Sequence, residues 1–594
     1  MAVLHPIDWI VIAVYAVATI ALGVGFSRRA SSSSGQYFLA GRSLPWWVVG
    51  TSMVATTFAA DTPLAVTGFI REHGIWYNWF GWHYVLSQML AVLLFSRFWR
   101  RAEVVTDNEL IEMRYSGRPA AVLRGFKAGY FALLYNFIVL GWVLKGMETV
   151  ADTVLGVDPR VAVLVGAALA LGYALLAGFW GVVVTDVIQF ALAMFGSIAV
   201  AVAAVDRVGG MDALRQRLVE APLFGENTLA LVPGGGLGLE SDFFRFLVFV
   251  SLMWWASHNA DGGGYIIQRM AAARDERHAR AATLWFVVAN NVVRYWPWIV
   301  VAVASLVLVP AVPEGMAEEA AYPLVMVQVL GPGLLGLLVV AFFAAFMSTV
   351  DTHLNWGASY LLNDVYRRFL RPDAGERETV IVAKLCLVVI MGCAILIAFQ
   401  LESIGKAWLF VWAMGAGIGP VLVLRWFWWR INAWSEIAAL ASSVIIAFGF
   451  ELVAAVQSAG AGVPYQLFVT PVRVGEMALG THHKALFLVP VSIAVWMLVT
   501  LLTRPATPER LEAFYRKVRP GGFWGPVAAR CPEVRSDGLS WRRLGLWAMG
   551  SAGVYGLLFG TGRIVLGEPG RAWPLLLTAA VAAVALTREL RRRD

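Results

Sequence analysis

Long apolar runs separated by short polar or basic segments make up most of this chain. A run of about 20 apolar residues is long enough to cross a bilayer as a helix. The pattern therefore predicts an all-α polytopic membrane protein with about 15 transmembrane helices. We expect these spans at residues 7–26, 45–70, 77–97, 124–150, 160–178, 181–204, 244–268, 282–310, 325–362, 379–399, 405–424, 433–456, 485–503, 542–561 and 572–588.

Two of these spans are interrupted by polar residues and helix breakers. The second contains TSMVATTFAAD at 51–61, followed by Thr62 and by Pro63, which lacks a backbone donor. The seventh contains SHNADGGGY at 257–265, and its glycines favour unwinding. Broken helices that open two five-helix halves indicate a transporter binding site, with the second half inverted relative to the first. Two kinked structural helices are the alternative, since proline and glycine occur freely in membrane spans.

The ninth span carries a polar face on an otherwise apolar helix. Ala345, Ser348, Thr349 and Thr352 are spaced at i, i+3, i+4 and i+7, so a helix places them on one side. Polar groups at membrane depth cost free energy unless they have a polar partner, and hard cations such as Na⁺ take oxygen ligands. The face therefore predicts either a Na⁺ site or a polar seam against another helix.

The composition supports a membrane protein and argues against an enzyme. Hydrophobic residues make up 59% of the 594 residues and charged residues only 14%, and the mean hydropathy is +0.69. Soluble domains have about 25% charged residues. The three cysteines suggest neither a disulfide framework nor a metal cluster. No segment is long and polar enough for a soluble catalytic domain, and an intramembrane enzyme using Asp351 and His353 would lack a persuasive nucleophile–base or metal arrangement.

The formal net charge of +8 is concentrated in alternate loops. The loop after the seventh span contributes Arg269, Arg274, Arg277 and Arg280, whereas the loop at 311–322 is acidic. Because basic loops stay in the cytoplasm, we expect the N-terminus outside and the C-terminus in the cytoplasm. The pattern predicts an integral plasma (cytoplasmic) membrane protein that contacts the lipid bilayer and no nucleic acid. It does not distinguish a monomer from a weak oligomer.

The same pattern divides the chain into segments. We expect an N-terminal extra span and cytoplasmic loop at 1–44, a first five-helix repeat at 45–206, an extracellular loop at 207–243, a second inverted repeat at 244–432, two additional spans at 433–503, a cytoplasmic segment at 504–541, and two C-terminal spans with a basic tail at 542–594.

Five motifs in this order resemble the sodium:solute symporter family, which contains proline, sugar and sialic-acid transporters. They are QYFLAGRSLPWW at 36–47, TSMVATTFAAD at 51–61, VVVTDVIQF at 182–190, YIIQRMAAA at 265–273 and FFAAFMSTVDTHLNWGASYLLNDVYR at 342–367. The resemblance implies the LeuT-type fold with a 5+5 inverted-repeat core. It also implies a secondary transporter that couples Na⁺ influx to solute uptake by alternating access, with Na⁺ as the coupling ion and no organic cofactor.

The resemblance also implies where the ions bind. Its shared sodium site would use backbone carbonyls of Ala55, Phe58 and Ala345 and the hydroxyls of Ser348 and Thr349. Asp186 matches a family aspartate linked to ion coupling and, in some members, to a second sodium site. That site would also use the positions of Asp351 and Thr352, and this chain departs from the family there because Asp351 replaces a hydroxyl residue. The Asp351 carboxylate is expected to strengthen a second cation site, carry a coupling proton or pair with a nearby cation, and helix capping or a salt bridge is the alternative for Asp186.

The solute is expected to bind between the two interrupted spans. Aromatic walls with a few polar groups suit a small polar organic molecule, and an amphoteric solute fits this set of residues as well as a sugar. His258 and His353 are proton-relay candidates, although a lone histidine is more often structural. The candidate cavity residues are Asp61, Thr62, Trp254, Trp255, His258, Asn259, Asp261, Asn290, Asn291 and Arg294.

Two functional alternatives to Na⁺-coupled uptake follow from the same residues. One is a proton-coupled symporter, which Asp351 suggests. The other is a solute sensor on the same fold that signals through a partner. The sensor would be marked by an attached histidine-kinase module, and the sequence contains none.

Overall fold

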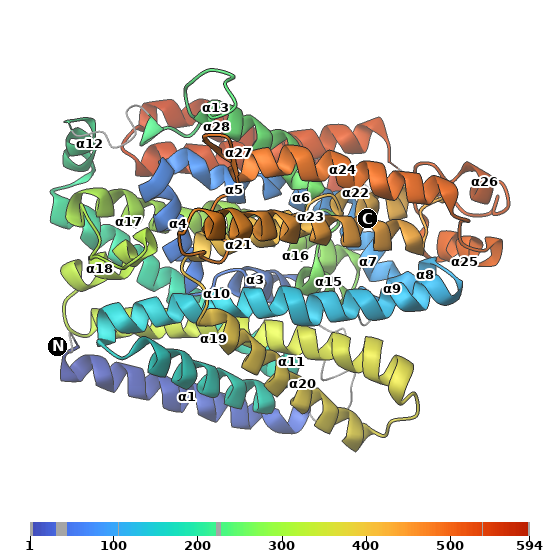
Figure 1. Cartoon of the computed structure of the whole chain (residues 1–594), viewed down its shortest axis with the longest axis horizontal. Helices are drawn as coiled ribbons and strands as arrows, with labels where there is room; N and C mark the ends of the chain where they lie inside the picture. The colour runs from blue at the N-terminus through green and yellow to red at the C-terminus, as the bar shows by residue number, and fades with distance from the viewer. Residues whose placement is uncertain (1–3, 31–43, 105, 221–226, 537–538, 592–594) are drawn as a thin grey trace.

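The computed structural model describes residues 4–30, 44–104, 106–220, 227–536 and 539–591. Helices run side by side along the long axis of the molecule (Figure 1). Strand structure in the described residues is limited to β1 (Arg473–Val474) and β2 (Met477–Ala478), which pair antiparallel. The all-α prediction is therefore confirmed. The motif at 36–47 lies mostly outside the described residues.

The first half of the chain begins with a single helix and then a broken one. α1 (Pro6–Ala30) precedes α3 (Trp46–Thr56) and α4 (Asp61–His73), which are bent by 56° at a break of four residues. The interruption predicted in the second span is confirmed. A set of shorter helical segments follows: η2 (Ile75–Asn78), α5 (Trp79–Trp82), α6 (Tyr84–Leu90), η3 (Ala91–Phe95), α7 (Ser96–Ala102) and α8 (Glu109–Arg114).

Two long helical columns complete this half. The first is α9 (Gly117–Gly129), η4 (Tyr130–Tyr135), α10 (Asn136–Val150) and η5 (Ala151–Leu155), and the second is α11 (Pro159–Val208). The Tyr173 hydroxyl lies 3.2 Å from the Thr185 hydroxyl, although 12 residues of straight helix would separate them by about 18 Å. The axis of α11 is therefore not straight between Tyr173 and Thr185.

The second half begins with another break. α13 (Asp242–Val248), η7 (Phe249–Met253) and α14 (Trp254–Ala256) are separated from α15 (Gly264–Ala272) by residues 257–263. Gly262 and Gly263 have φ angles of +126° and +73°, which side chains rarely adopt, so glycine permits this break. The seventh span is therefore interrupted as predicted.

Longer helices surround this break. They are α16 (Glu276–Val288), η8 (Ala289–Val293), α17 (Tyr295–Leu308), η9 (Glu318–Ala320), α18 (Ala321–Val329), α19 (Leu334–Tyr360), η10 (Leu361–Leu370), α20 (Glu376–Ala398), α21 (Ile404–Gly415) and α22 (Gly419–Phe427). α21 and α22 are bent by 42°, which the sequence analysis did not predict. Gly417 has φ +86° at this bend, and its N–H donates to the Ala256 carbonyl at 3.0 Å.

The remaining helices lie outside these halves. They are α12 (Met211–Glu220) between the halves, and then α23 (Ala433–Gly460), α24 (Thr481–Leu502), α25 (Pro508–Val518), α26 (Gly525–Ala528), α27 (Trp541–Val565) and α28 (Pro569–Arg591). Figure 1 places α8, α25 and α26 at one end of the molecule and α12, α17 and α18 at the other.

The predicted number of spans is not fully matched by helices of the described residues that are long and apolar enough to cross a membrane. In the described residues, nine helices are long and apolar enough to cross a membrane, and the two bent pairs raise the number to 11. The expected count of 15 is not confirmed. The other four predicted spans correspond to the short apolar part of α1, the short segments of 75–102, the start of α11 and the broken helix at 242–272.

Candidate functional site

The break between α3 and α4 lies against the polar face of α19. The Thr349 hydroxyl donates to the Thr56 carbonyl at 3.0 Å, at the last residue of α3. Ala55, Phe58, Ala345, Ser348 and Thr349 are all buried, with at most 4% of each residue exposed. α19 is helical throughout 334–360, so the predicted face exists. The five predicted sodium ligands thus come from two elements that are in contact.

A second polar cluster lies beside this break and centres on Asp186 of α11. The Asp186 carboxylate accepts from Ser348 and Ser52, both at 2.5 Å, and forms an ion pair with Arg269 at 3.3 Å. Arg269 also donates to Thr56 at 2.7 Å and to Thr352 at 2.8 Å. One guanidinium therefore links α3, α11, α15 and α19 in the interior of the protein.

Arg269 corrects the sequence analysis, which placed it in a basic loop. Its side chain is 1% exposed and lies on α15, because α15 continues to Ala272 and carries Arg269 into the core. The sequence contained a signal for this position, since Gln268 and Arg269 interrupt the apolar run YIIQRMAAA.

Asp351 is a second carboxyl group near this cluster, and no described residue forms an ion pair with it. It is 1% exposed, and its Oδ1 has no hydrogen-bond partner among the described residues. When the carboxylates of Asp186 and Asp351 are both ionised, Arg269 neutralises only one of them. One negative charge then remains uncompensated. A buried charge needs an opposite charge or a proton, so this face of α19 favours a cation.

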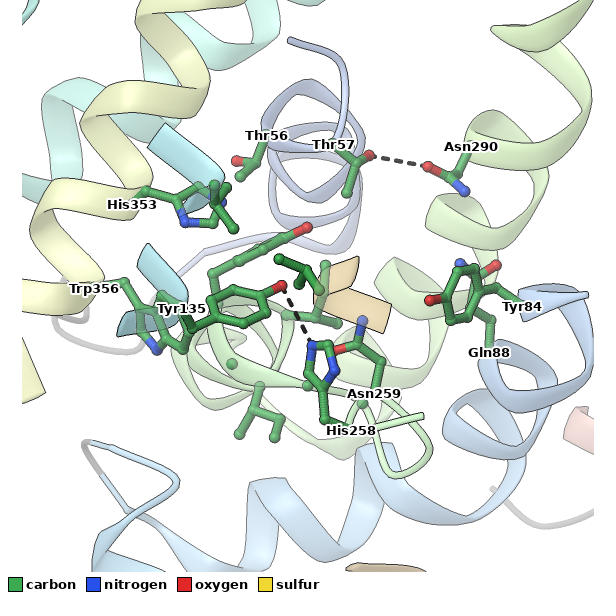
Figure 2. A pocket seen from close by; sticks show the side chains of 18 of the residues that line it. Thr56, Thr57, Tyr84, Gln88, Tyr135, His258, Asn259, Asn290, His353 and Trp356 are labelled. Carbon is green, nitrogen blue, oxygen red and sulfur yellow. Dashed lines mark hydrogen bonds between the residues drawn. The ribbon is translucent and has the colours of Figure 1, made fainter. Parts of the chain in front are cut away.

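A cavity of about 250 Å³ lies between the two helix breaks. Figure 2 shows Thr57 of the first break bound to Asn290, and His258 of the second break bound to Tyr135. Asn290 lies in η8 and Tyr135 ends η4, both π-helical segments, which often occur at functional sites. The predicted residues that line the cavity are Asp61, Thr62, His258, Asn259, Asp261, Asn290 and Arg294.

Three predicted cavity residues lie outside the lining. The ring of Trp254 packs against Trp547 of α27 at 5.4 Å, and Trp255 donates its indole N–H to the Ser251 carbonyl of its own helix. Asn291 donates to Gln88 at 2.6 Å, one residue along the helix from Asn290. Asn291 therefore contacts a lining residue, Gln88, whereas Trp254 and Trp255 make these contacts with residues outside the lining.

Most charged side chains that line the cavity are held by protein partners, whereas the Oδ1 of Asp61 has no hydrogen-bond partner among the described residues. Asp261 pairs with Arg425 at 2.6 Å and accepts from the Trp426 indole at 2.9 Å. Arg294 donates to the Thr57 carbonyl, and to the Asn290 carbonyl at 3.0 Å. Lys127 lies 3.6 Å from Asp107, which also accepts from Tyr360.

Several polar atoms in the lining have no protein partner. Within the described residues, the indole N–H groups of Trp356 and Trp412 and the Nδ1 of His258 make no hydrogen bond. Buried polar groups are normally satisfied, so the hydrogen-bond network around the cavity is incomplete at these atoms. His353 differs, since its Nδ1 lies 2.7 Å from the Asn136 amide oxygen and its carbonyl accepts from the same amide at 2.7 Å. That contact fits a structural histidine.

A family model described as "Sodium:solute symporter family" matches residues 37–445. This chain belongs to the sodium:solute symporter family. It is 28% identical over 466 residues to a sodium/glucose cotransporter of Vibrio parahaemolyticus, covering 74% of this chain and 84% of that protein. It is 25% identical over 479 residues to the sodium/mannose cotransporter SLC5A10 of Bos taurus, covering 74% of this chain and 78% of the relative.

A solved structure agrees in fold. A Na⁺-coupled sialic acid symporter, in a substrate-bound outward-open state, has a TM-score of 0.64 and 19% sequence identity, and the match covers 85% of this chain and 99% of that chain. The symporter therefore has the LeuT-type fold, as the resemblance implied. It is a multi-pass membrane transporter, not an enzyme, and it couples Na⁺ to the transport of a small solute.

The symporter's cavity also contains residues that the sequence analysis missed. They lie on helical segments outside the two predicted breaks, where nothing in the sequence separates a lining residue from a packing residue. The main examples are Tyr84, Gln88, Tyr135, Trp142, Trp356, Trp408 and Trp412.

Proposed function

We propose that this symporter takes up a neutral polyhydroxylated solute, such as a monosaccharide, together with Na⁺. The observation that carries the proposal is that two acid–base pairs in the cavity, Asp261 with Arg425 and Asp107 with Lys127, neutralise each other. A charged solute would have to compete with these partners, whereas a neutral one would not.

The remaining lining suits a sugar. The amides of Gln88, Asn259 and Asn290 can both donate and accept, as can the hydroxyls of Tyr84 and Tyr135. Aromatic side chains from several helices, among them α6, α10, α19 and α21, provide apolar faces for the C–H surfaces of a sugar ring. The relatives named as glucose and mannose cotransporters support the same class of solute.

Asp61 and Arg294 keep an amphoteric solute as the competing candidate. Both line the cavity at the first break, and Arg294 lies close enough to influence Asp61 electrostatically. Arg294 is held by two backbone carbonyls, which favours a structural role at the break. In the sugar proposal, Asp61 and Arg294 therefore stabilise the break between α3 and α4 and do not bind the solute.

For Na⁺, the proposed ligands are the carbonyls of Ala55, Phe58 and Ala345 and the hydroxyls of Ser348 and Thr349. Support comes from the contact between Thr349 and the end of α3, because unwound carbonyls and hydroxyls together can replace a hydration shell. The proposed second cation or coupling site uses Asp186, Asp351 and Thr352. Its support is the excess negative charge beside Arg269.

We also propose that the protein lies in the plasma membrane with its N-terminus outside and its C-terminus in the cytoplasm. α25, which has a net positive charge, lies at one end of the molecule, and α18, which follows the acidic loop, lies at the other (Figure 1). Basic and acidic loops should lie on opposite sides of the membrane, because basic loops stay in the cytoplasm. The assignment of the two repeats to 45–206 and 244–432 is part of the same proposal.

A solute panel tests the proposed class. Purified protein in liposomes with an inward Na⁺ gradient would be given labelled glucose, mannose, galactose, proline and sialic acid. The proposal expects accumulation of at least one hexose and none of proline or sialic acid. Accumulation of proline or sialic acid without any hexose would overturn it in favour of a charged or amphoteric solute.

A further inference from the structure

A second pocket, of about 670 Å³, lies away from the transport cavity, where α8, α9, η10 and the start of α25 meet. Arg118 of α9, Arg368 of η10 and Arg510 of α25 line it. All three side chains are exposed at the surface. Figure 1 places α8 and α25 together at one end of the molecule.

Two helix N-termini abut at this pocket. α9 begins at Gly117 and α25 begins at Pro508, and the Thr507 N–H donates to the Ser116 hydroxyl at 3.2 Å. The N-terminus of a helix carries a partial positive charge from its unsatisfied N–H groups. Both helices are longer than two turns, and the first turn of α9 contains no acidic residue, so this end attracts an anion. The end of α25 contributes less, because Pro508 has no N–H and Glu509 lies in its first turn.

The side chains strengthen the positive potential. Glu112 is the only acidic residue among those that line the pocket, and it already accepts from Arg368 at 2.8 Å and from Arg124 at 2.6 Å. Partial burial would raise the pKa of Glu112, but these two guanidinium groups lower it below its ordinary value. Arg118 and Arg510 have no ion-pair partner among the described residues. The pocket therefore has uncompensated positive charge.

The surroundings of the pocket are apolar and exposed. Val122 and Phe126 follow Arg118 at i+4 and i+8 on α9, so they continue the same helix face. They are 57% and 45% exposed, and Phe369 and Leu370 of η10 are 44% and 65% exposed. Phe369 packs over Gly125 of α9, so the two apolar groups are contiguous. In a membrane protein, such a surface faces acyl chains.

We propose that this pocket binds the phosphate headgroup of an anionic phospholipid, with the acyl chains lying along Val122, Phe126, Phe369 and Leu370. Basic pockets beside membrane helices bind acidic lipid headgroups in this way. The apolar stripe distinguishes a lipid from free phosphate, which would need only the charged part of the site. The bound lipid links η10, the continuation of the helix that carries Ser348 and Thr349, to α25 outside the two halves.

Native mass spectrometry of the full-length protein with phosphatidylglycerol tests the proposal. Arg118→Gln with Arg510→Gln should weaken phosphatidylglycerol binding about 30-fold, as expected for two basic groups at a membrane surface. The matched control is Arg377→Gln with Arg535→Gln, which removes the same charge from two exposed arginines outside the pocket. The control should bind phosphatidylglycerol like the unmodified protein. Equal binding by both double variants would overturn the proposal.

Two further arms separate lipid from phosphate and folding from binding. Inorganic phosphate at millimolar concentration should not displace phosphatidylglycerol, and displacement would show a simple anion site in place of a lipid site. Arg118→Lys with Arg510→Lys keeps the charge and should retain most of the binding. Loss of binding in this conservative variant with an unchanged thermal unfolding midpoint would contradict a headgroup held by charge. None of these readouts depends on the identity of the transported solute.

Discussion

At the scale of single residues, the proposed sodium site depends on two adjacent hydroxyls that point in different directions. Thr349 bonds to the end of α3, and Ser348 bonds to Asp186. Ser348→Ala and Thr349→Ala should each raise the Na⁺ concentration for half-maximal uptake about tenfold, because each removes one oxygen ligand. Initial uptake rates over a range of Na⁺ concentrations measure this. Ser359→Ala, further along α19, is the matched control, and an unchanged Na⁺ dependence in the Ser348/Thr349 double variant would remove the assigned site.

Asp351 is a buried carboxyl group whose Oδ1 has no hydrogen-bond partner among the described residues, so its role in ion coupling can be tested directly. If the carboxylate contributes to a second cation site, Asp351→Ala should convert a sigmoidal Na⁺ dependence to a hyperbolic one. The physical reason is that the excess negative charge beside Arg269 disappears with the carboxylate. Uptake measured against Na⁺ concentration at several pH values checks both cation types. Superimposable curves for the variant and the unmodified protein would make Asp351 structural, whereas a changed pH profile alone would assign it to proton coupling.

At the scale of elements, the N-terminal helix supplies a cap to the helix that carries the sodium ligands. The Asp8 carboxylate accepts from the N–H groups of Gly333 at 2.6 Å and Gly336 at 2.8 Å, at the start of α19. Negative charge at a helix N-terminus satisfies free donors and opposes the helix dipole. α1 therefore stabilises α19 although it lies outside the proposed repeats.

Asp8→Ala should lower the free energy of unfolding by about 1–2 kcal/mol, the usual cost of losing a helix cap. Thermal unfolding of detergent-solubilised protein measures the loss. Asp8→Asn keeps one acceptor oxygen and should cost less. Equal unfolding midpoints for Asp8→Ala and the unmodified protein would show that α1 does not stabilise α19 through this carboxylate.

The elements also show what the sequence could predict. The breaks at Thr57–Ala60 and at 257–263 were predictable because glycine, proline and clustered polar residues are local signals. The bend at Gly417 carries a similar signal, GAGIGP, but lacks clustered polar side chains and was missed. The expected count of 15 spans is not confirmed by the length and hydropathy of the described helices, since short segments and breaks divide several apolar runs.

At the scale of the whole molecule, contacts between residues far apart in the sequence could not be predicted. Arg269 contacts Asp186, Thr56 and Thr352 from three other elements, and only the folded chain brings them together. Gln88 and Tyr135 line the cavity from unbroken helices for the same reason. The motifs identified the family and the fold, whereas ion pairs in the cavity, such as Asp261 with Arg425, became visible only in the folded chain.

The most direct test of the central claim, Na⁺-driven uptake of a neutral sugar, is the accumulation of one labelled hexose in liposomes that contain only this protein. With an inward Na⁺ gradient, the internal hexose concentration should rise above the external one, and a Na⁺ ionophore should abolish the rise. A protonophore should leave it unchanged. Accumulation that follows an imposed proton gradient without Na⁺, or no accumulation of any hexose, would contradict the account.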